Sequence, residues 1–422
     1  MRRAGGLLAT LAVLASAALT LAACGGGTRH PPLPPGDRIR GDRLTVYVSV
    51  PLNGASAVGG RAVVRGAKLA LAHGQGRIGR YRVVLRVLDD STPATLQWSA
   101  PQTTIDANRA VADRTTIGYI GDLNSGASAV SIPLLNRVGI AQISPASTAV
   151  GLTAGGPYAE PGEPQAYYPT TRRTFARVVP SDLVQAQVQV ELQRQLGCHL
   201  TYVLYDDEYD GEATFWAFQA LARQRGLQFV SQQYLPGVSS YLPIAQTVRQ
   251  SGADCVMVAA IASPSAVALA TQVAAKVPNA YLLGTSGLAQ SSFTNPLRGG
   301  IPAAIDRRVL VTIAAGDPAA DNPQAAAFER AYTRAYGSDP EPVAINGYES
   351  MSLMLSAIRA ATDGGRRSAQ RVEVVKALFA TRGRRSPIGT YSIRSDGNTT
   401  LDRYGVYRVE RGRLQFWRAM TG

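Results

Sequence analysis

The stretch GDLNSGASAVSIPLLNRVGIAQISPAST, residues 121–148, decides the fold. It follows one apolar run, contains a helical segment that ends at Arg137, and continues into a second apolar run, GIAQIS, at 139–144. A buried strand, a helix and another buried strand in this order are typical of a parallel sheet covered on both faces. Small hydroxyl-bearing residues around a proline follow the second strand directly, so we expect something small and polar to be held at its end.

The same alternation extends outward along the chain. Before the loop at 151–173, we predict strands at 43–52, 81–90, 115–123 and 139–144, with helices at 63–73, 97–113 and up to Arg137. After that loop, we predict strands at 174–180, 200–207, 227–235, 254–260, 280–286 and 307–315, with helices through 196 and at 212–225, 241–251 and 264–276. Two parallel sheets of similar build follow from this pattern.

The last part of the chain returns to helices and then to strands. Helices are predicted at 323–336, 343–361 and 368–380, followed by short strands with turns at Asp396-Gly397 and Arg411-Gly412. A chain of 422 residues is longer than one core usually serves. We therefore predict an α/β protein of two lobes, between which the chain crosses more than once.

The composition is that of a folded globular protein, with 45% hydrophobic and 17% charged residues. The formal net charge is +14, and only three of the 43 basic residues are lysines. Nucleic-acid binding usually needs clustered basic residues interleaved with aromatic ones. Here the arginines are scattered and the densest run, RGRRS at 382–386, is short. We interpret the charge as a solvated basic surface and expect no nucleic-acid partner.

The N-terminus has the features of a bacterial secretory signal. Arg2 and Arg3 precede an uncharged run that ends in small residues before Cys24. A membrane-spanning helix is the alternative, but the run is rich in Ala and Gly and has no basic or aromatic flank at its far end. The closing LAAC resembles the lipobox of bacterial lipoproteins, which implies a signal peptide at 1–23 and acylation of Cys24. Residues 24–42 would then be the lipidated cysteine and a Gly- and Pro-rich tether.

The other two cysteines, Cys198 and Cys255, form a candidate disulfide in an oxidising compartment. They precede or begin strands one and three of the second lobe. In the strand order 2-1-3-4-5 these strands are parallel neighbours. Two buried thiols are the alternative interpretation.

Several catalytic and cofactor motifs fit poorly or are missing. GQGRIG at 74–79 matches the dinucleotide fingerprint, but it follows a helix and precedes a strand, which is the wrong context. The sequence has no phosphate-binding P-loop, no G-x-S-x-G nucleophile elbow and no zinc motif. The acidic run DDEYD at 206–210 lacks the ligand spacing of a calcium loop, and we interpret it as a strand-end loop. We therefore expect no enzyme, no metal and no cofactor.

Polar side chains follow many of the predicted strands: Asn53, Ser125, Ser144 to Thr148, Asp206 to Tyr209, and Ser286. Ligands of open α/β sheets bind outside the carboxyl ends of the strands. Ser125 also begins a predicted helix, whose free N–H groups attract an anion. Ordinary N-capping explains any one of these residues, but the whole set predicts a ligand site that includes a nest for a carboxylate.

Four segments carry a resemblance to a known family: RLTVYVSVPLNGASAVGGRAVVRGAKLALA, GDLNSGASAVSIPLLNRVGIAQISPAST, YVLYDDEYDGEATFWAFQALARQRGL and GADCVMVAA. In order and spacing they resemble type I periplasmic binding proteins over most of residues 43–410, closest to the leucine/isoleucine/valine-binding branch of ABC importers. The resemblance implies two Rossmann-like lobes joined by three crossovers, a ligand cleft between them and no enzymatic activity. It implies lobes at 43–178 plus 316–398 and at 179–315 plus 399–422.

The resemblance also carries over individual residues. Ser125 and the PAST turn (Ala146, Ser147, Thr148) match positions that hold an amino-acid carboxylate, and Tyr209 matches a cleft tyrosine of the second lobe. Two pocket tyrosines of the family fall near Val58 and near Ile261, and the glutamate that binds the ligand's ammonium falls at Ser286. These departures argue against a leucine-like ligand, because an ammonium in a dry cleft needs a carboxylate partner.

The resemblance therefore implies a lipid-anchored, extracytoplasmic protein that binds a small amino-acid-like, carboxylate or amide ligand. Its partners would be an ABC permease and the bacterial cell membrane, and we expect a monomer. A ligand-sensing receptor or regulatory ectodomain on the same fold is the alternative, because a fold does not choose between these functions.

Overall fold

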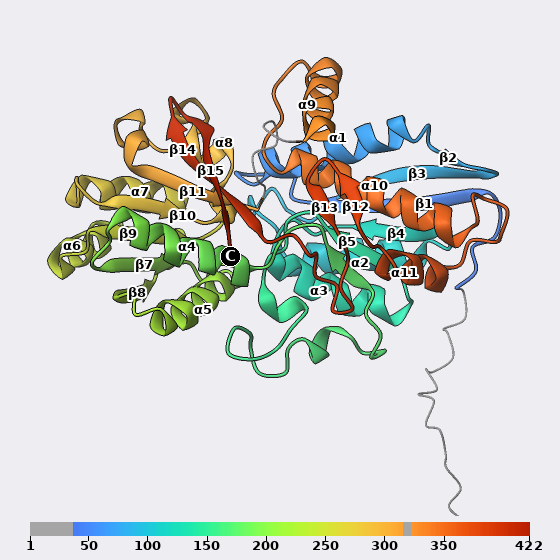
Figure 1. Cartoon of the computed structure of the whole chain (residues 1–422), viewed down its shortest axis with the longest axis horizontal. Helices are drawn as coiled ribbons and strands as arrows, with labels where there is room; N and C mark the ends of the chain where they lie inside the picture. Colours follow the sequence, from blue (N-terminus) through green and yellow to red (C-terminus); the bar gives the residue numbers. More distant parts are fainter. Residues whose placement is uncertain (1–36, 315–321) are drawn as a thin grey trace, which may run out of the picture. The chain divides into compact units, whose positions relative to one another are not determined.

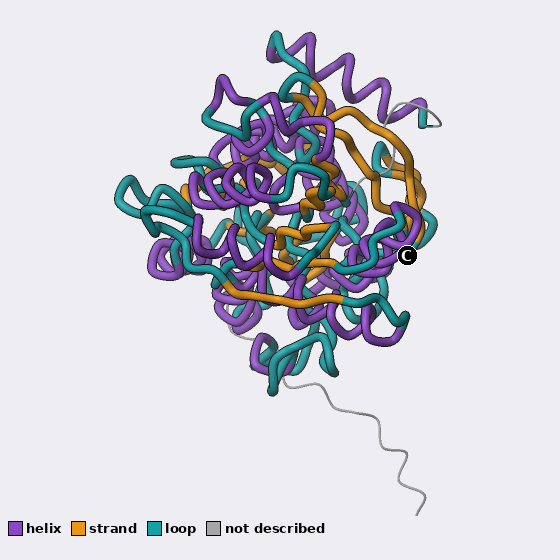
Figure 2. The backbone as a smooth tube through the Cα atoms, turned by 90° about the vertical axis from the view of Figure 1, so that its left-hand side faces the viewer, coloured by secondary structure: helices purple, strands orange, loops and turns teal. Residues whose placement is uncertain are grey.

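A computed structural model describes residues 37–314 and 322–422 (Figure 1). The predicted signal peptide, Cys24, most of the tether and the proposed boundary at 315/316 lie outside these residues. The described chain forms two large sheets, and Figure 2 shows helices packed against the strands of both. Within the described ranges, no helix has the length and hydropathy needed to span a bilayer.

The first sheet has the strand order β2-β3-β1-β4-β5-β6. Its strands are β1 (Arg43–Val50), β2 (Arg77–Ile78), β3 (Tyr81–Asp89), β4 (Thr116–Ile120), β5 (Ala141–Ser144) and β6 (Phe175–Arg177). All neighbours pair in parallel except β2 with β3. β1 lies in the middle of this sheet, and seven of its eight residues are buried, as expected where helices cover both faces.

The two faces of the first sheet are covered by different sets of helices. Helices α2 (Ala100–Ala112) and α3 (Ser125–Arg137) pack on one face over a core that includes Tyr47 and Tyr119. The other face is covered by α1 (Ala57–His73), α10 (Ala344–Ala361) and α11 (Arg371–Phe379), and α9 (Pro323–Tyr336) lies against α1. A small sheet of β12 (Arg384–Ser386) and β13 (Gly389–Tyr391) completes what we call the N-lobe.

Helices α1 and α10 are far apart in sequence but approach each other very closely. A Cβ at Gly347 of α10 would lie 2.5 Å from the carbonyl oxygen of Val63, and one at Gly66 of α1 would lie 2.1 Å from that of Ala344. Real side chains cannot occupy such positions, so these two glycines allow the backbones to meet. This contact fixes the start of α10 against the first sheet.

The second sheet has the strand order β15-β14-β11-β10-β9-β7-β8. Its strands are β7 (Thr201–Tyr205), β8 (Phe229–Gln233), β9 (Cys255–Ala259), β10 (Tyr281–Gly284), β11 (Val309–Ile313), β14 (Arg403–Glu410) and β15 (Arg413–Thr421). The five strands β7 to β11 have the predicted order 2-1-3-4-5, and the last two add an antiparallel hairpin with its turn at Arg411-Gly412.

Helices cover the second sheet on both faces to form what we call the C-lobe. Helices α4 (Asp182–Leu196) and α5 (Tyr209–Gln224) pack on one face, and α6 (Leu242–Ser251) and α7 (Pro264–Lys276) on the other. The short α8 (Ser291–Thr294) lies near β15. The predicted strand at 174–180 begins the second series in sequence. In the structure it forms β6, which lies at the edge of the first sheet instead.

The chain alternates between the two sheets in the order N-lobe, C-lobe, N-lobe, C-lobe. The predicted boundaries at 178/179 and 398/399 fall between elements that belong to different lobes, β6 and α4 in one case and β13 and β14 in the other. The precise extent of each lobe stays a prediction.

Cys198 and Cys255 are joined in a disulfide, with Cα atoms 5.8 Å apart. Cys198 precedes β7, and Cys255 is the first residue of β9, its parallel neighbour. The bond therefore lies at the amino ends of these strands, at the opposite edge of the sheet from their carboxyl ends.

Replacing both cysteines with serine should lower the free energy of unfolding by about 4 kcal/mol, because the bond spans 57 residues and restricts the unfolded chain. Urea unfolding of the variant and the oxidised parent measures this difference. Thiol titration of unreduced, denatured protein is the control, and two free thiols there would contradict the assignment.

Candidate functional site

A cavity of about 80 Å³ lies where the carboxyl ends of the strands of both lobes meet. This volume has room for several water molecules, and so for a small solute. The N-lobe contributes the end of β4, the turn after β5 and the start of α10. The C-lobe contributes the start of α5 and the segments that follow β9, β10 and β11. The location is the usual one for ligands of open α/β sheets.

The cavity wall mixes apolar and polar side chains but has no basic ones among the described residues that line it. The apolar part includes Leu123, Val179, Ile261, Ile313 and Val343. The polar part consists of Asn124, Thr148, Asp210, Thr214, Thr285, Ser286, Gln290 and Asn346. Asp210 is therefore the only ionisable side chain in the described lining.

The turn after β5 is held by hydroxyl groups that accept backbone N–H bonds. Ser144 Oγ accepts from the N–H groups of Ala146 (3.2 Å) and Ser147 (2.8 Å). Ser125 Oγ, at the start of α3, accepts from Thr148 and Ala149, each at 3.2 Å. The predicted neighbourhood of Ser125 and the PAST turn is present. The serine hydroxyls, however, bind the turn itself.

Arg177, fully buried at the end of β6, lies behind this turn. Its guanidinium donates to the carbonyl oxygens of Ser147 (3.1 Å) and Ala149 (2.8 Å), and also to Asn398 Oδ1 (2.8 Å). Burial lowers the pKa of Arg177, while the nearby carboxylate of Asp182 opposes this shift. The arginine thus joins the PAST turn to two of the segments that connect the lobes.

Asp210, in the first turn of α5, reaches across from the C-lobe to the N-terminus of α3. The backbone N–H of Ser125 donates to both of its carboxylate oxygens, at 2.9 and 3.1 Å. Burial raises the pKa of Asp210, and bonds from Ser125 and Gly126 oppose that shift. The anion nest predicted at Ser125 therefore holds a carboxylate of the protein itself.

Asp182 adds a second carboxyl behind the cavity. It is fully buried, and its Oδ1 accepts from Gln185 at 2.8 Å. Burial raises its pKa to about 7, with Asp210 adding to the shift, while the nearby hydroxyls of Thr148 and Thr214 lower it. Asp182 and Asp210 thus lie close together, and the charge of Arg177 lowers the pKa of Asp182.

Two amides in the lining have acceptor oxygens without a partner. Asn124 and Asn346 are each only 5% exposed, and the Oδ1 atom of each has no hydrogen bond within the described protein. They face the cavity from separate elements, the N-cap of α3 and the first turn of α10. A buried acceptor without a partner is unfavourable, so the site favours a solute that donates hydrogen bonds.

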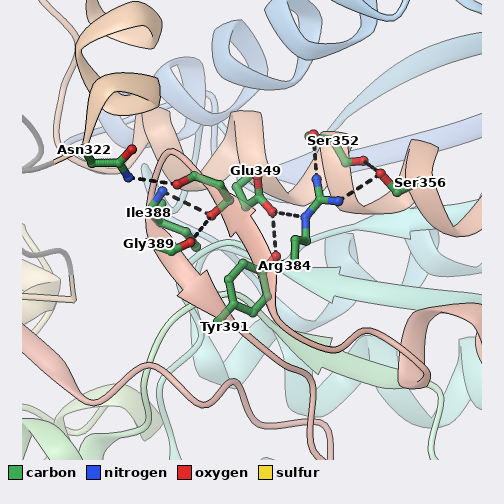
Figure 3. A network of polar contacts seen from close by, with 9 residues as sticks. Asn322, Glu349, Ser352, Ser356, Arg384, Ile388, Gly389 and Tyr391 are labelled. Carbon is green, nitrogen blue, oxygen red and sulfur yellow. Dashed lines mark hydrogen bonds and ion pairs between the residues drawn. The ribbon is translucent and has the colours of Figure 1, made fainter.

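Helix α10, which carries Asn346, is held by a polar network around the buried Glu349 (Figure 3). Arg384 of β12 contacts Glu349 at 2.5 Å and donates to two serines of the same helix. Tyr391 of β13 donates to the same carboxylate oxygen at 2.6 Å. Glu349 is fully buried and lies one turn beyond Asn346. The small hairpin therefore fixes the part of α10 that lines the cavity.

Further contacts join the lobes at the rim of the cavity. Glu208 of the C-lobe accepts from Trp98 Nε1 and Gln97 Nε2, both at 3.1 Å. Tyr209 donates to Glu163 Oε1 at 2.5 Å, and Tyr167 donates to the same atom. Burial raises the pKa of Glu208 to about 7, and the charge of Asp210 adds to this shift.

A family model described as periplasmic binding protein matches residues 44–413. The chain belongs to the periplasmic binding protein family. No curated protein matched the sequence.

Among solved structures, the leucine-binding protein LivK from Thermotoga maritima is 21% identical, with a TM-score of 0.76 over 90% of this chain and 99% of its own. The branched-chain amino acid-binding protein LivJ from Streptococcus pneumoniae, with isoleucine, is 16% identical, with a TM-score of 0.75 over 90% and 100%. A solute-binding protein of an ABC transporter from Rhodopseudomonas palustris, with p-hydroxybenzoic acid, is 17% identical, with a TM-score of 0.74 over 90% and 97%. These similarities support the two-lobed periplasmic-binding-protein fold.

The structure brings some of the predicted ligand residues to the cavity and gives others different surroundings. Ala146, Thr148 and Ser286 line it, as does Ile261 at a position where the family has a tyrosine. Ser125, Ser147 and Tyr209 lie outside the lining. Ser125 and Ser147 are fully buried and bonded to neighbouring groups, and Tyr209 is bonded to Glu163. Direct ligand contacts by all six predicted residues stay predictions.

Sequence reasoning missed Asn124, Asp210 and Asn346. The first is adjacent to the predicted Ser125, and Asp210 ends the acidic run already assigned to a strand-end loop, so both were within reach of the pattern. No sequence pattern pointed to Asn346, because α10 reaches the cavity from a distant part of the chain. No group of three or more potential ligands in residues 37–314 and 322–422 is arranged to hold a metal.

The two lobes should separate more readily as the pH rises from 5 to 8. Burial raises the pKa of Glu208 from its usual 4.5 to about 7 and the charge of Asp210 adds to this shift, while the bond from Trp98 opposes it. Separating Glu208 from its N-lobe partners Trp98 and Gln97 removes part of this burial, so the closed form binds the proton more tightly than an open one. Closure is therefore most favourable below pH 4.5 and weakens through about pH 7. Small-angle X-ray scattering should show a larger radius of gyration at pH 8.

The matched variants are Glu208→Gln, which cannot ionise, and Glu191→Gln at an exposed position of α4. The first should show a smaller change with pH, and the second should behave as the parent does. An equal change in Glu208→Gln and the parent would contradict the role of Glu208.

Proposed function

We propose that this protein is the extracytoplasmic solute-binding component of an ABC importer. The observation that supports this most is the cavity between the carboxyl ends of two parallel sheets, in a chain that the periplasmic binding protein family matches over residues 44–413. The related structures described above include one with isoleucine and one with p-hydroxybenzoic acid. The proposed ligand here is likewise a small amino-acid-like, carboxylate or amide solute.

The proposed activity is binding without catalysis. Thr148 and Ser286 come from different lobes and both line the cavity, so a solute between them would touch both lobes only when they close. Hinge closure of this kind is the usual motion of this architecture. The partner that would receive the solute is an ABC permease, and the protein would act as a monomer.

We further propose that Cys24 carries the lipid that holds the protein at the outer face of the cell membrane. The support is the LAAC sequence after an uncharged run that follows Arg2 and Arg3. The Gly- and Pro-rich residues after Cys24 would keep the folded part away from the membrane.

A thermal-shift screen of small solutes should find at least one that raises the melting temperature. A ligand at 100 times its Kd adds about 2.7 kcal/mol to stability. Thr148→Val should weaken binding of that solute by about 1–3 kcal/mol by removing a cavity hydroxyl. Thr247→Val, at an exposed position of α6, is the control. If amino acids, amides, amines and organic acids all leave the melting temperature unchanged, the proposed function is wrong.

Mass spectrometry of the protein purified from its own membranes should find acyl chains on Cys24 and no residues before it. The matched Cys24→Ser variant should appear in the soluble fraction. A native N-terminus at Met1 would rule out the anchor.

A further inference from the structure

We propose that the cavity selects a small organic cation with N–H donors, such as a primary ammonium or an amidinium, and rejects carboxylates. This inference rests on the proposed solute-binding function and replaces its broad ligand class, an amino-acid-like, carboxylate or amide solute, with an organic cation. It stands on the position of Asp210, on the absence of basic side chains from the described lining, and on two unpaired amide oxygens.

The place where an anionic ligand would bind is already filled. The start of α3 offers the N–H of Ser125 and the positive end of the helix dipole. Asp210 accepts this N–H with both carboxylate oxygens, at 2.9 and 3.1 Å. The Ser125 hydroxyl and the N–H of Gly126 also bond Asp210, and the hydroxyl oxygen, which is fully buried, accepts from two backbone N–H groups. A ligand carboxylate would therefore have to displace Asp210.

The charges around the cavity also disfavour an anion. Asp210 lines it, and Asp182 lies behind it, close enough that the charge of Asp210 raises the pKa of the Asp182 carboxyl. The nearest buried cation, Arg177, is bonded to Ser147, Ala149 and Asn398 and does not line the cavity. A second carboxylate would add repulsion in a poorly solvated site, whereas a cation would compensate the charge already there.

The remaining polar groups match donors. Asn124 and Asn346, each 5% exposed, line the cavity, and the buried Oδ1 atom of each has no partner in the described protein. An ammonium carries three N–H donors, and an amidinium carries four. Either group has enough donors for Asp210 and the two amide oxygens, whereas a carboxylate has none.

The test is a calorimetric and thermal-shift series of matched trios that share one carbon skeleton. The shortest practical trio is n-butylamine, butyramide and butyrate, and the series extends over skeletons of three to six carbons. In most trios the amine should bind at least tenfold more tightly than the carboxylate, with the neutral amide between them.

Two variants distinguish a cavity in which Asp210 recognises the ligand from one in which Asp210 only caps α3. Asp210→Asn keeps an oxygen that can accept the Ser125 N–H but removes the charge, so it should weaken amine binding at least tenfold and amide binding less than threefold. Asn346→Leu should weaken amines and amides alike. Asp207→Asn, exposed and three residues before Asp210, is the control and should change neither.

Each other outcome overturns the proposal. A carboxylate or a neutral amide as the tightest member of the trios contradicts the ligand class, and so does a solute from the general screen that binds although no amine does. An equal loss for all three members in Asp210→Asn means that the carboxylate only caps α3. If no solute of any class shifts the melting temperature, the proposed function itself fails, which is a distinct result.

Discussion

The contact on which the site most depends is the buried guanidinium of Arg177. A fully buried charge is tolerated only where its donors are satisfied, and here they bind the carbonyl oxygens of Ser147, in the PAST turn, and of Ala149, directly after it, and the side chain of Asn398. β6 leads into the first connection between the lobes, and Asn398 belongs to the last described one. One side chain therefore fixes the wall of the cavity relative to the segments about which the lobes move.

Several carboxyls around the cleft share one physical property. Asp182, Glu208 and Asp210 all have a pKa raised chiefly by burial, and too few cations lie nearby to reverse the shift. Two of them, Glu208 and Asp210, belong to the C-lobe and accept hydrogen bonds from the N-lobe. The approach of the lobes therefore brings together acidic groups and donors, and proton uptake, closure and solute charge are linked through the same side chains.

The sequence was sufficient to predict the alternating strands and helices, the strand order of β7 to β11 and the meeting of Ser125 with the PAST turn. These features follow from local hydrophobic patterns and from the rule that parallel strands end at one edge. The sequence could not predict the hydrogen-bond partners of the polar side chains. That Asp210, not a ligand, binds the start of α3 depends on how closely two lobes approach. The place of Asn346 depends on the glycine contact between α1 and α10 and on the ion pair of the buried Glu349 with Arg384. The position of β6 at the edge of the first sheet could likewise be assigned only from the strand pairing in the structure.

The carboxylate of Asp210 at the start of α3 can be regarded as a tethered competitor. Groups held in one chain meet at effective concentrations in the millimolar range or above. When the lobes come together, free anions outside the cytoplasm, such as acetate or phosphate, must compete with this high local concentration of the Asp210 carboxylate. The N-terminus of α3, which attracts anions, is thereby protected from these free anions, and no bulky side chain is needed to block their entry.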